Sequence, residues 1–538
     1  MKELVLIIPI IPLIIAGLIG VINSKEAIPR ISMFFSALIA VLGIIGAYFV
    51  IFEDRNIYGF GNLLVFDELS AILVPYVAIL GMVIRKYSAK YMWDEKGYNR
   101  FFILLNFIFV GIYLLIMSNH LVVLAIAWQI MSLALYFLVS FNIESKSAVK
   151  FGNWTILIHK AADLLFIIAV VLTYKTFGTF YLSELYDIWL SQYNSLEAIP
   201  TIVYVIGFLY LFAAMMKSAI IPFHIWLPYT SEGPTPVSAL MHAGVVNVGG
   251  IVLNKLSYLL LLTPLVLNVA FAFGLFTAIF ASMIMLTTPD IKRSLGYSTV
   301  GQMGYMIMEI GLGAFSLAVY HLIVHGIFKA SLFLESGSLI HYARHDPNIP
   351  KRLSYEVFWE EKIHNKQQTK NLYWIIALFT VIPVIIFAGV KFLLSEEFFH
   401  FNAAVVILAF AWLTGTQLFL SFFKVSLSDS PKVIIGLLVS FTLIVLTYEF
   451  VGKTMETFIY GEHAKLFYET ASLNLSVILA LALLILILIV GWAYIYKQHF
   501  IDIEIEGEKP NKLKWTFYKL LSREAYFPDF FLKIFKIF

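Results

Sequence analysis

Apolar residues in this chain of 538 residues gather in long blocks that short polar stretches separate. Most blocks reach the length of about 20 mostly apolar residues that a helix needs to cross a bilayer. They do not alternate polar with apolar residues, as the strands of a membrane β-barrel do. The pattern predicts an all-α integral membrane protein, a polytopic bundle of about 13–15 transmembrane helices. The blocks begin near Val5, Ile31, Leu69, Phe101, Leu121, Leu157, Thr201, Val237, Pro264, Leu295, Ser316, Trp374, Ala403, Val433 and Leu473.

Composition agrees with this interpretation. Hydrophobic residues make up 61% of the chain and charged residues 13%, whereas a soluble domain carries about 25% charged residues. A water-soluble fold of this length could not bury so much apolar surface. We therefore expect a lipid bilayer around residues 1–496, which form one polytopic transmembrane domain.

The basic residues are concentrated in alternate loops. One set of loops carries most of them, for example Lys25 with Arg30, and Lys146 with Lys150, while the intervening loops carry few. Because Lys and Arg are enriched in cytoplasmic loops, we expect a cell (inner) membrane protein with its N-terminus outside and its C-terminus cytoplasmic. Residues 497–538 mix basic and aromatic residues. They are expected to form a cytoplasmic basic amphipathic tail, either a helix at the membrane surface or an ordinary basic terminus.

Two prolines predict interruptions within apolar blocks. Pro222 follows Lys217 in the seventh block, and Pro383 precedes Lys391 in the twelfth. Proline removes a helix hydrogen bond, and broken helices in membranes tend to line cavities. We expect broken helices 7 and 12 within inverted repeats of five helices, an arrangement found in many transporters.

Several kinds of chemistry have no visible site. Cysteine is absent, which excludes disulfides, thiolate-held zinc and iron–sulfur clusters on this chain. Neither a P-loop nor a glycine-rich dinucleotide fingerprint is found, so ATP and NADH have no recognisable site. We predict no cofactor, no metal, no nucleic-acid partner and no enzymatic activity of the chain itself.

Ionisable residues nevertheless stand inside the apolar blocks. Each costs at least about 2.5 kcal/mol at mid-bilayer, so such residues usually have a function. The candidates for ion translocation are Lys160, Asp163, Lys217, His242, His321, His325, Lys329 and Lys391.

Three of these residues repeat every four positions. His321, His325 and Lys329 therefore stack on one helix face, which suits a proton wire because histidine changes charge near neutral pH. A purely structural role, with bonds across helices, is the alternative. Two histidines at this spacing could also bind zinc, but no third ligand of suitable type stands nearby. Lys160 and Asp163 are three residues apart and could form only a local pair.

The segments around these residues resemble the antiporter-like family of membrane subunits. The resemblance is dense from Trp128 to His341 and weak in the first 100 residues and after Pro383. The family includes the large proton-pumping NuoL-type subunit of respiratory complex I, the Mrp sodium–proton antiporter subunits, and the DabB subunits of inorganic-carbon transporters. The motifs are MKSAIIPFHIWLP at 216–228, GPTPVSALMHAG at 233–244, TPDIKRSLGYST at 288–299, QMGYM at 302–306 and HLIVHGIFKASLFLESGS at 321–338.

The resemblance implies a polar axis that carries protons across the membrane. Lys217 matches the family's lysine before the seventh-helix break, and His242 matches its eighth-helix histidine. Lys160 with Asp163, and His321 with His325 and Lys329, match its charged positions in the sixth and eleventh helices.

One departure concerns Gln129, which stands where complex I subunits have a glutamate after a tryptophan. An amide cannot hold a proton to pass on, so the family's carboxylate–lysine coupling is expected to be missing. In the twelfth block, AGVKFLLSEE at 388–397 shifts the lysine and lacks an aspartate. Whether Lys391 is the family's twelfth-helix lysine is left open.

Two segments, HAGVVNVGG at 242–250 and MEIGLGAFSLAVYHLIVHGIFKA at 308–330, look like DabB. That resemblance implies the membrane subunit of an energy-coupled transporter of CO2 or bicarbonate. It would conduct H⁺ or Na⁺ to drive a large peripheral zinc-binding DabA-like subunit, similar to carbonic anhydrases. The alternatives are a NuoL-like proton-translocating subunit of a complex I-type NADH–quinone oxidoreductase or membrane hydrogenase, and a cation/proton antiporter.

Overall fold

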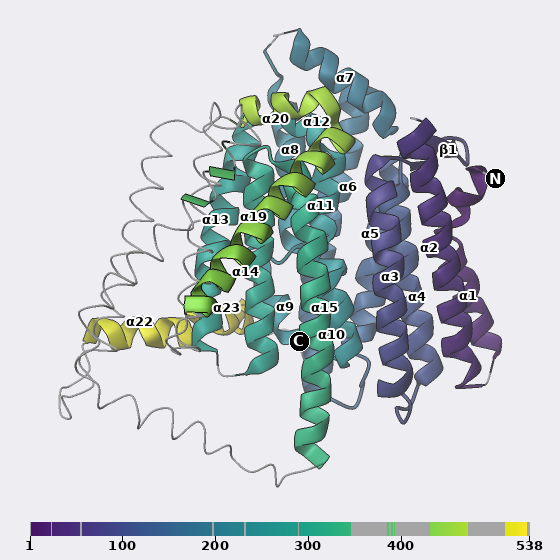
Figure 1. Cartoon of the computed structure of the whole chain (residues 1–538), viewed down its shortest axis with the longest axis vertical. Coiled ribbons are helices and arrows are strands. Elements are labelled where there is room, and N and C mark those ends of the chain that lie inside the picture. Colours follow the sequence, from purple (N-terminus) through teal and green to yellow (C-terminus); the bar gives the residue numbers. More distant parts are fainter. Residues whose placement is uncertain are drawn as a thin grey trace. The chain divides into compact units, whose positions relative to one another are not determined.

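The computed structural model describes residues 2–22, 24–53, 56–195, 198–230, 233–288, 290–345, 385–386, 389–390, 392, 431–471 and 512–534. These residues are mostly helical, as Figure 1 shows. They belong to two compact units, Met1–Ser338 with Lys509–Phe538, and Leu339–Glu508.

The first unit holds most of the described elements. In chain order they are η1 (Lys2–Ile7), α1 (Ile11–Val21), α2 (Ala27–Glu53), β1 (Ile57–Gly59), β2 (Leu64–Phe66), α3 (Glu68–Tyr91), α4 (Tyr98–Met117), α5 (Leu121–Val139), α6 (Lys146–Phe177), α7 (Leu182–Asn194), α8 (Thr201–Lys217), η2 (Phe223–Ile225), α9 (Trp226–Tyr229), α10 (Thr235–Ala243), η4 (Val245–Asn247), α11 (Val248–Lys255), α12 (Ser257–Leu261), α13 (Pro264–Thr287), α14 (Ile291–Gly311), α15 (Phe315–His345, whose last residues belong to the second unit), α22 (Lys512–Ser522), η9 (Glu524–Tyr526) and α23 (Phe527–Ile534). In the second unit, α19 (Pro431–Tyr460) leads through η8 (Gly461–His463) into α20 (Ala464–Thr470).

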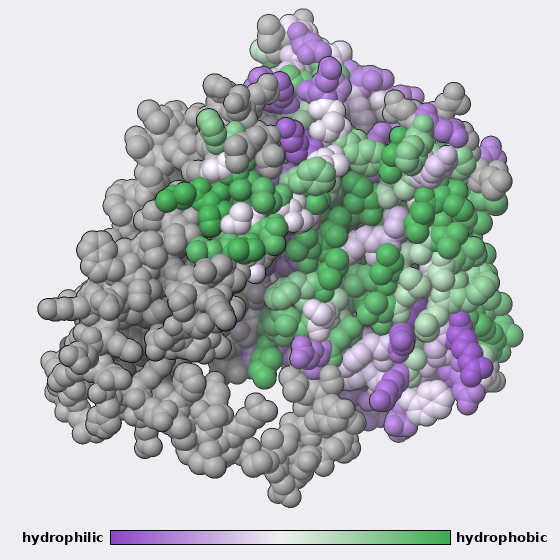
Figure 2. Space-filling model, viewed as in Figure 1, coloured by the Kyte–Doolittle hydropathy of each residue, from purple (hydrophilic) through white to green (hydrophobic). Residues whose placement is uncertain are grey.

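The protein is an all-α, multi-pass integral membrane protein. Within the described residues, nine helices are long and apolar enough to cross a membrane. Large apolar side chains such as Phe137, Leu164 and Phe328 are more than half exposed. In Figure 2 apolar side chains cover the middle of the visible face, and polar side chains gather toward the two ends. A surface of this kind is stable against lipid and not against water.

Neighbouring helices of the first unit pack closely along the chain. α2 lies on α3, α4 on α5, α6 on α8 and α13 on α14. Glycine explains the closest of these contacts: a Cβ added at Gly304 would lie 2.8 Å from the carbonyl oxygen of Gly274. Small residues allow this approach between membrane helices, where van der Waals packing drives association.

Several predicted blocks differ in detail. The first is divided near Pro9 into the 3-10 helix η1 and the 11-residue helix α1, which has Pro12 in its first turn. The block at Val237 is divided at Gly244 into α10 and α11. The blocks that begin near Trp374, Ala403 and Leu473, with Pro383, lie outside the described residues, and the five-helix repeat stays a prediction.

Two features were not predicted. The amphipathic helix α7 crosses the upper end of the bundle in Figure 1, and the hairpin β1–β2 lies at the same end. We call this the outer end, after the side of the membrane on which the sequence predicts the N-terminus. The loops at 92–97 and 142–145 lie at the other end, together with the first turn of α14, and we call it the basic end. The division at residue 497 stays a prediction, although the tail contains α22 and α23.

Candidate ion-translocation site

The break predicted at Pro222 is confirmed, and it places Lys217 at the last position of α8. Pro222 cannot donate a hydrogen bond and would clash with the carbonyl four residues earlier. The chain turns there through Ala219, whose φ is 54°. Side-chain hydrogen bonds tie the break to neighbouring segments: the hydroxyl of Ser218 donates to the carbonyl of Val246 over 2.8 Å, and the hydroxyl of Thr277 accepts from the freed amide of Ile221 over 3.2 Å.

Lys217 is buried among polar and aromatic partners. Its side chain is 1% exposed, and Nζ lies 3.1 Å from Oδ1 of Asp163 on α6. Nζ also donates to the carbonyl of Trp128 over 2.9 Å and to the hydroxyl of Ser132. It lies 4.5 Å from the centre of the Trp128 ring. A buried ammonium needs such compensation, because an unpaired charge in a low dielectric is very costly.

Asp163 joins Lys217 to Lys160. Oδ2 lies 3.1 Å from Nζ of Lys160, whose side chain is 42% exposed, whereas that of Asp163 is 2% exposed. The local pair predicted from the three-residue spacing is therefore present, but Asp163 also binds Lys217. One carboxylate shared by a buried and a half-exposed lysine can transfer its ion pairing from one to the other.

Gln129 does not occupy the place that we expected. Its side-chain carbonyl accepts a hydrogen bond from Lys160, whereas Lys217 has Asp163 as its carboxylate partner. The fifth-helix carboxylate of the complex I subunits is absent here, but Lys217 still has a carboxylate partner, because Asp163 reaches it from α6. Gln129 fixes the orientation of Lys160 without adding a charge.

The ladder on α15 lies as its spacing predicted. The rings of His321 and His325 are 6.1 Å apart, and Nζ of Lys329 donates to the carbonyl of Leu295 over 3.3 Å. His325 is 5% exposed and Lys329 1%. These groups extend along α15 next to α14, and they form a second group of ionisable residues.

His242 lies at the second helix break, beside the ladder. Its ring stacks on Phe333 of α15 at 4.2 Å, and it is close enough to Lys329 for their charges to interact. Gly326 allows this approach, since a Cβ there would lie 2.7 Å from the carbonyl oxygen of Ala243. The structure thus brings His242 together with His325 and Lys329.

The ladder ends at an acidic residue that our sequence analysis did not single out. Oε2 of Glu309 lies 3.5 Å from Nδ1 of His321, and its side chain is 2% exposed. Glu309 is an acid inside an apolar block, so the criterion that selected the other candidates would have found it. It gives the ladder a carboxylate, as Asp163 does for Lys217.

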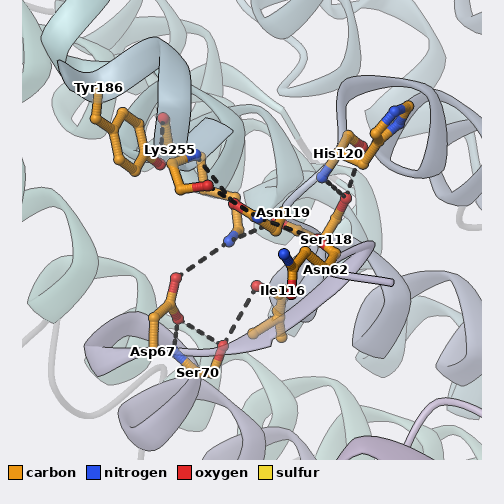
Figure 3. Close-up of polar contacts among 10 residues, drawn as sticks. Asn62, Asp67, Ser70, Ile116, Ser118, Asn119, His120, Tyr186 and Lys255 are labelled. Atoms are coloured by element: carbon orange, nitrogen blue, oxygen red, sulfur yellow. Dashed lines mark hydrogen bonds and ion pairs between the residues drawn. The ribbon is translucent and has the colours of Figure 1, made fainter. Parts of the chain in front are cut away.

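A further polar cluster lies at the outer end, and Figure 3 shows it. Nζ of Lys255, at the end of α11, lies 3.5 Å from Oδ2 of Asp67, and the two side chains are 2% and 19% exposed. Nζ also donates to the carbonyl of Ser118 over 3.2 Å. Asp67 caps α3 by accepting from the amide and the hydroxyl of Ser70 over 2.8 and 2.6 Å. Asp67 and Lys255 stand at the ends of apolar blocks, where the sequence does not indicate that they form an ion pair.

The loop around this cluster is firmly held. Asn119 accepts from the amide of Ser183 over 3.1 Å and donates to the carbonyl of Asn62 over 3.0 Å. His120 caps α5, since its Nδ1 accepts from the amide of Val122 over 3.2 Å. Burial lowers the pKa of His120, which favours the neutral ring that this cap requires.

Lys391 lies outside the described residues, so seven of the eight predicted residues have a described position. Six of them form two groups, Lys160–Asp163–Lys217 and His321–His325–Lys329, and His242 joins the second group. In the described part of the chain, no three His, Cys, Asp or Glu side chains converge as a metal site. Within each group, charged or titratable side chains lie within a few ångström of one another, an arrangement of ionisable residues that membrane proteins typically use on ion pathways.

Comparison with known proteins agrees with this geometry. The profile of the family described as NADH:quinone oxidoreductase/Mrp antiporter, TM, matches residues 118–428. That of NADH-Ubiquinone oxidoreductase (complex I), chain 5 N-terminus, matches residues 62–102. Two solved structures have a similar fold at low identity. A chain of the Mrp complex from Dietzia sp. DQ12-45-1b has a TM-score of 0.60 at 21% identity, covering 98% of this chain and 60% of that one. A chain of the archaeal membrane-bound sulfane sulfur reductase has a TM-score of 0.59 at 16% identity, covering 98% and 97%.

Relatives with curated names fall into two groups. A protein of Halothiobacillus neapolitanus named "Probable inorganic carbon transporter subunit DabB1" is 36% identical over 99% of this chain and 96% of its own length. NADH-quinone oxidoreductase subunit L of Buchnera aphidicola is 36% identical over 53% of this chain and 46% of its own. The chloroplastic NAD(P)H-quinone oxidoreductase subunit 5 of Pelargonium hortorum is 32% identical over 62% and 48%. The chain thus spans about half the length of the oxidoreductase subunits it matches.

Proposed function

The chain belongs to the NADH:quinone oxidoreductase/Mrp antiporter family of transmembrane subunits, and from this we propose that it is the membrane subunit of an energy-coupled inorganic-carbon transporter. The observation that carries the proposal is the similarity to a DabB1 subunit over nearly the full length of both chains. Similarity to the oxidoreductase subunits covers only about half of them.

The proposed mechanism uses the polar axis as a cation path. A cation flows down its gradient from the outer end, past the ladder on α15 and the Lys217 group, to the basic end. Lys217 receives and releases the charge while Asp163 moves its pairing between Lys217 and Lys160, which lie 3.1 Å from its two oxygens. Shared pairing keeps the buried carboxylate compensated in both states, which lowers the barrier to moving the charge.

The chain itself would carry no enzymatic chemistry in this scheme. A large peripheral zinc-binding DabA-like subunit would bind at the cytoplasmic face and interconvert CO2 and bicarbonate. The chain would lie in the cell membrane with its N-terminus outside, since basic residues favour the cytoplasmic side. Either H⁺ or Na⁺ could be the coupling ion, and ionophores that dissipate one gradient or the other distinguish them.

The proposal is tested in a host that lacks its own bicarbonate uptake and grows only in high CO2. The chain and its partner together should restore growth in air and the accumulation of labelled bicarbonate, and the chain alone should restore neither. A protonophore should abolish accumulation if protons drive it, and a sodium ionophore if Na⁺ does. NADH-linked proton pumping by the chain in its native membrane, without carbon uptake, would instead favour an oxidoreductase subunit.

A further inference from the structure

A buried carboxylate from the C-terminal segment lies at the basic end of the helix bundle. Glu524 begins η9, between α22 and α23, and is 6% exposed. Its Oε2 accepts a hydrogen bond of 2.8 Å from the hydroxyl of Tyr229, the last residue of α9. Because α9 resumes the helix broken after Lys217, the tail reaches the same interrupted element that carries the central lysine.

The backbone around Glu524 adopts a conformation that needs support. Glu524, Ala525 and Tyr526 have φ angles of 53°, 50° and 60°. Residues other than glycine rarely adopt this left-handed region, and it persists where the surroundings hold it. Here it ends α22 and directs the carboxylate into the bundle, while α22 itself packs against α13. Strain of this kind is typical of functional positions rather than of a loose terminus.

The groups that face Glu524 are mainly hydroxyls. Tyr229 donates to it, and Tyr297 of α14 lies against it. The guanidinium of Arg293 lies over the Tyr229 ring at 4.4 Å, and that of Arg523 over the Tyr526 ring at 5.5 Å. Asp529 is close enough to interact with Tyr229. No ion pair to Glu524 is found among the described residues, so gain or loss of a proton changes the net charge of this pocket.

Two buried histidines lie between Glu524 and the central lysines. His224 is 0% exposed, and its ring lies 5.0 Å from that of Phe527 and 5.9 Å from that of Tyr297. His159 is 1% exposed, meets the edge of Trp226 at 4.5 Å, and is close enough to Lys217 and Lys160 to interact with both.

Among the described residues, neither ring nitrogen of His159 has a hydrogen-bond partner, and the ring of His224 interacts with the backbone of Pro222. Buried polar atoms are nearly always bonded, to protein or to ordered water. The two nitrogens of His159 therefore need a partner such as an ordered water, and an imidazole can both accept and donate a proton.

We infer that Glu524 is the proton-exchange residue at the cytoplasmic end of the ion path, so that the C-terminal segment completes the path. A proton released by the Lys217 group passes by way of the His159 and His224 imidazoles to the Glu524 carboxylate. The resulting carboxylic acid then releases it to cytoplasmic water. The inference rests on the proposed function. It adds that the ion leaving by this route is a proton.

The test compares Glu524→Gln with Asp529→Asn in the full chain, expressed with its partner. Both variants remove one acid from the same segment, but Asp529 is exposed. Glu524→Gln should lower protonophore-sensitive bicarbonate uptake about tenfold or more, since loss of a proton-transfer group typically costs orders of magnitude. Glu524→Asp should restore part of the rate, and Asp529→Asn should match wild type. Equal uptake by Glu524→Gln and Asp529→Asn overturns the inference.

Failure to assemble is controlled by a second variant. Tyr229→Phe keeps the carboxylate and the aromatic packing but removes a donor that favours the charged carboxylate. The pH profile of bicarbonate uptake, measured by varying the cytoplasmic pH, should then shift toward higher pH. An unmoved profile overturns the inference even if Glu524→Gln does not accumulate in the membrane. Absence of carbon uptake by wild type would instead count against the proposed function, whereas uptake that follows a sodium gradient alone would count against proton exchange at Glu524.

Discussion

The ammonium group of Lys217 lies 3.1 Å from Oδ1 of Asp163, although the two residues come from different helices. The other oxygen of the same carboxylate lies 3.1 Å from Lys160. The buried lysine thus competes with a half-exposed one for a single acid. In the proposed mechanism, this competition allows the site to exchange charge rather than only to hold it.

The first prediction concerns proton release by Lys217. Lys217→Arg keeps a positive charge beside Asp163, but a guanidinium does not deprotonate in proteins. We expect it to lower carbon uptake about a hundredfold, as loss of a proton-transfer group does, while the protein stays in the membrane. Lys217→Ala should be equally inactive.

Lys175→Ala, on the exposed side of α6, is the matched control and should transport normally. Uptake is measured with labelled bicarbonate and normalised to the amount of protein in the membrane. Wild-type uptake by Lys217→Arg would mean that Lys217 acts only as a structural cation.

The interrupted helix of Lys217 could be predicted from the sequence, and its partner could not. Pro222 gives a local signal, because a missing donor ends a helix wherever it occurs. That Asp163 reaches Lys217, and that Gln129 meets Lys160, depends on how α5, α6 and α8 pack. Spacing along one helix says which residues share a face, but it does not say which helix covers that face.

The same limit explains the residues that were missed. Asp67 and Lys255 stand at the ends of apolar blocks and Glu524 in the tail, and only the fold pairs the first two and buries Lys255 and Glu524. On α15, in contrast, the four-residue spacing alone determines that the side chains share one helix face. His321, His325 and Lys329 were therefore placed correctly. Local patterns were predictable, and contacts between distant segments were not.

A second prediction concerns the ion pair at the outer end (Figure 3). Asp67→Asn keeps a capping side chain for α3 but removes the negative charge beside the buried Lys255 ammonium, which keeps its hydrogen bond to the carbonyl of Ser118. Breaking a buried pair in this way costs about 3 kcal/mol or more. Lys255→Met should cost less, because Asp67 is partly exposed and keeps its bonds from Ser70.

The double variant Asp67→Asn with Lys255→Met should be more stable than Asp67→Asn alone. The measurement is the unfolding temperature of the purified protein in detergent, for all four members of the cycle. Strict additivity of the two changes would show that the pair has no coupling energy.

A third prediction concerns the paired glycines in the first turn of α11. A Cβ at Gly249 would lie 2.5 Å from the carbonyl oxygen of Ala214 and would meet the hydroxyl of Ser218, at the α8 break. Gly249→Ala should therefore destabilise the protein by about 1–3 kcal/mol, the usual cost of overpacking, and lower transport.

Gly20→Ala in α1 is the control, since nothing lies within 4 Å of the added atom. Alanine favours a helix over glycine by about 1 kcal/mol, so this variant should be as stable as wild type or more so. Thermal unfolding and bicarbonate uptake are compared for both. Unchanged stability of Gly249→Ala would mean that α8 and α11 can separate without cost.

The last prediction concerns Gln129→Glu, which tests whether the neutral side chain is part of the mechanism. Gln129 accepts a hydrogen bond from Lys160, and Lys160 also lies 3.1 Å from Asp163. The introduced carboxylate would attract Lys160 with a full charge and draw it away from Asp163, which would then bind Lys217 more tightly. A lysine held more firmly in its charged form releases a proton less readily, so we expect carbon uptake to fall or to stay unchanged.

Gln129→Leu separates charge from hydrogen bonding, because it removes the acceptor without adding an acid. Uptake of labelled bicarbonate is measured for both variants in cells that also express the partner. A clear gain of uptake by Gln129→Glu would indicate that the site works as a carboxylate-dependent pump, with glutamine as a weakened substitute.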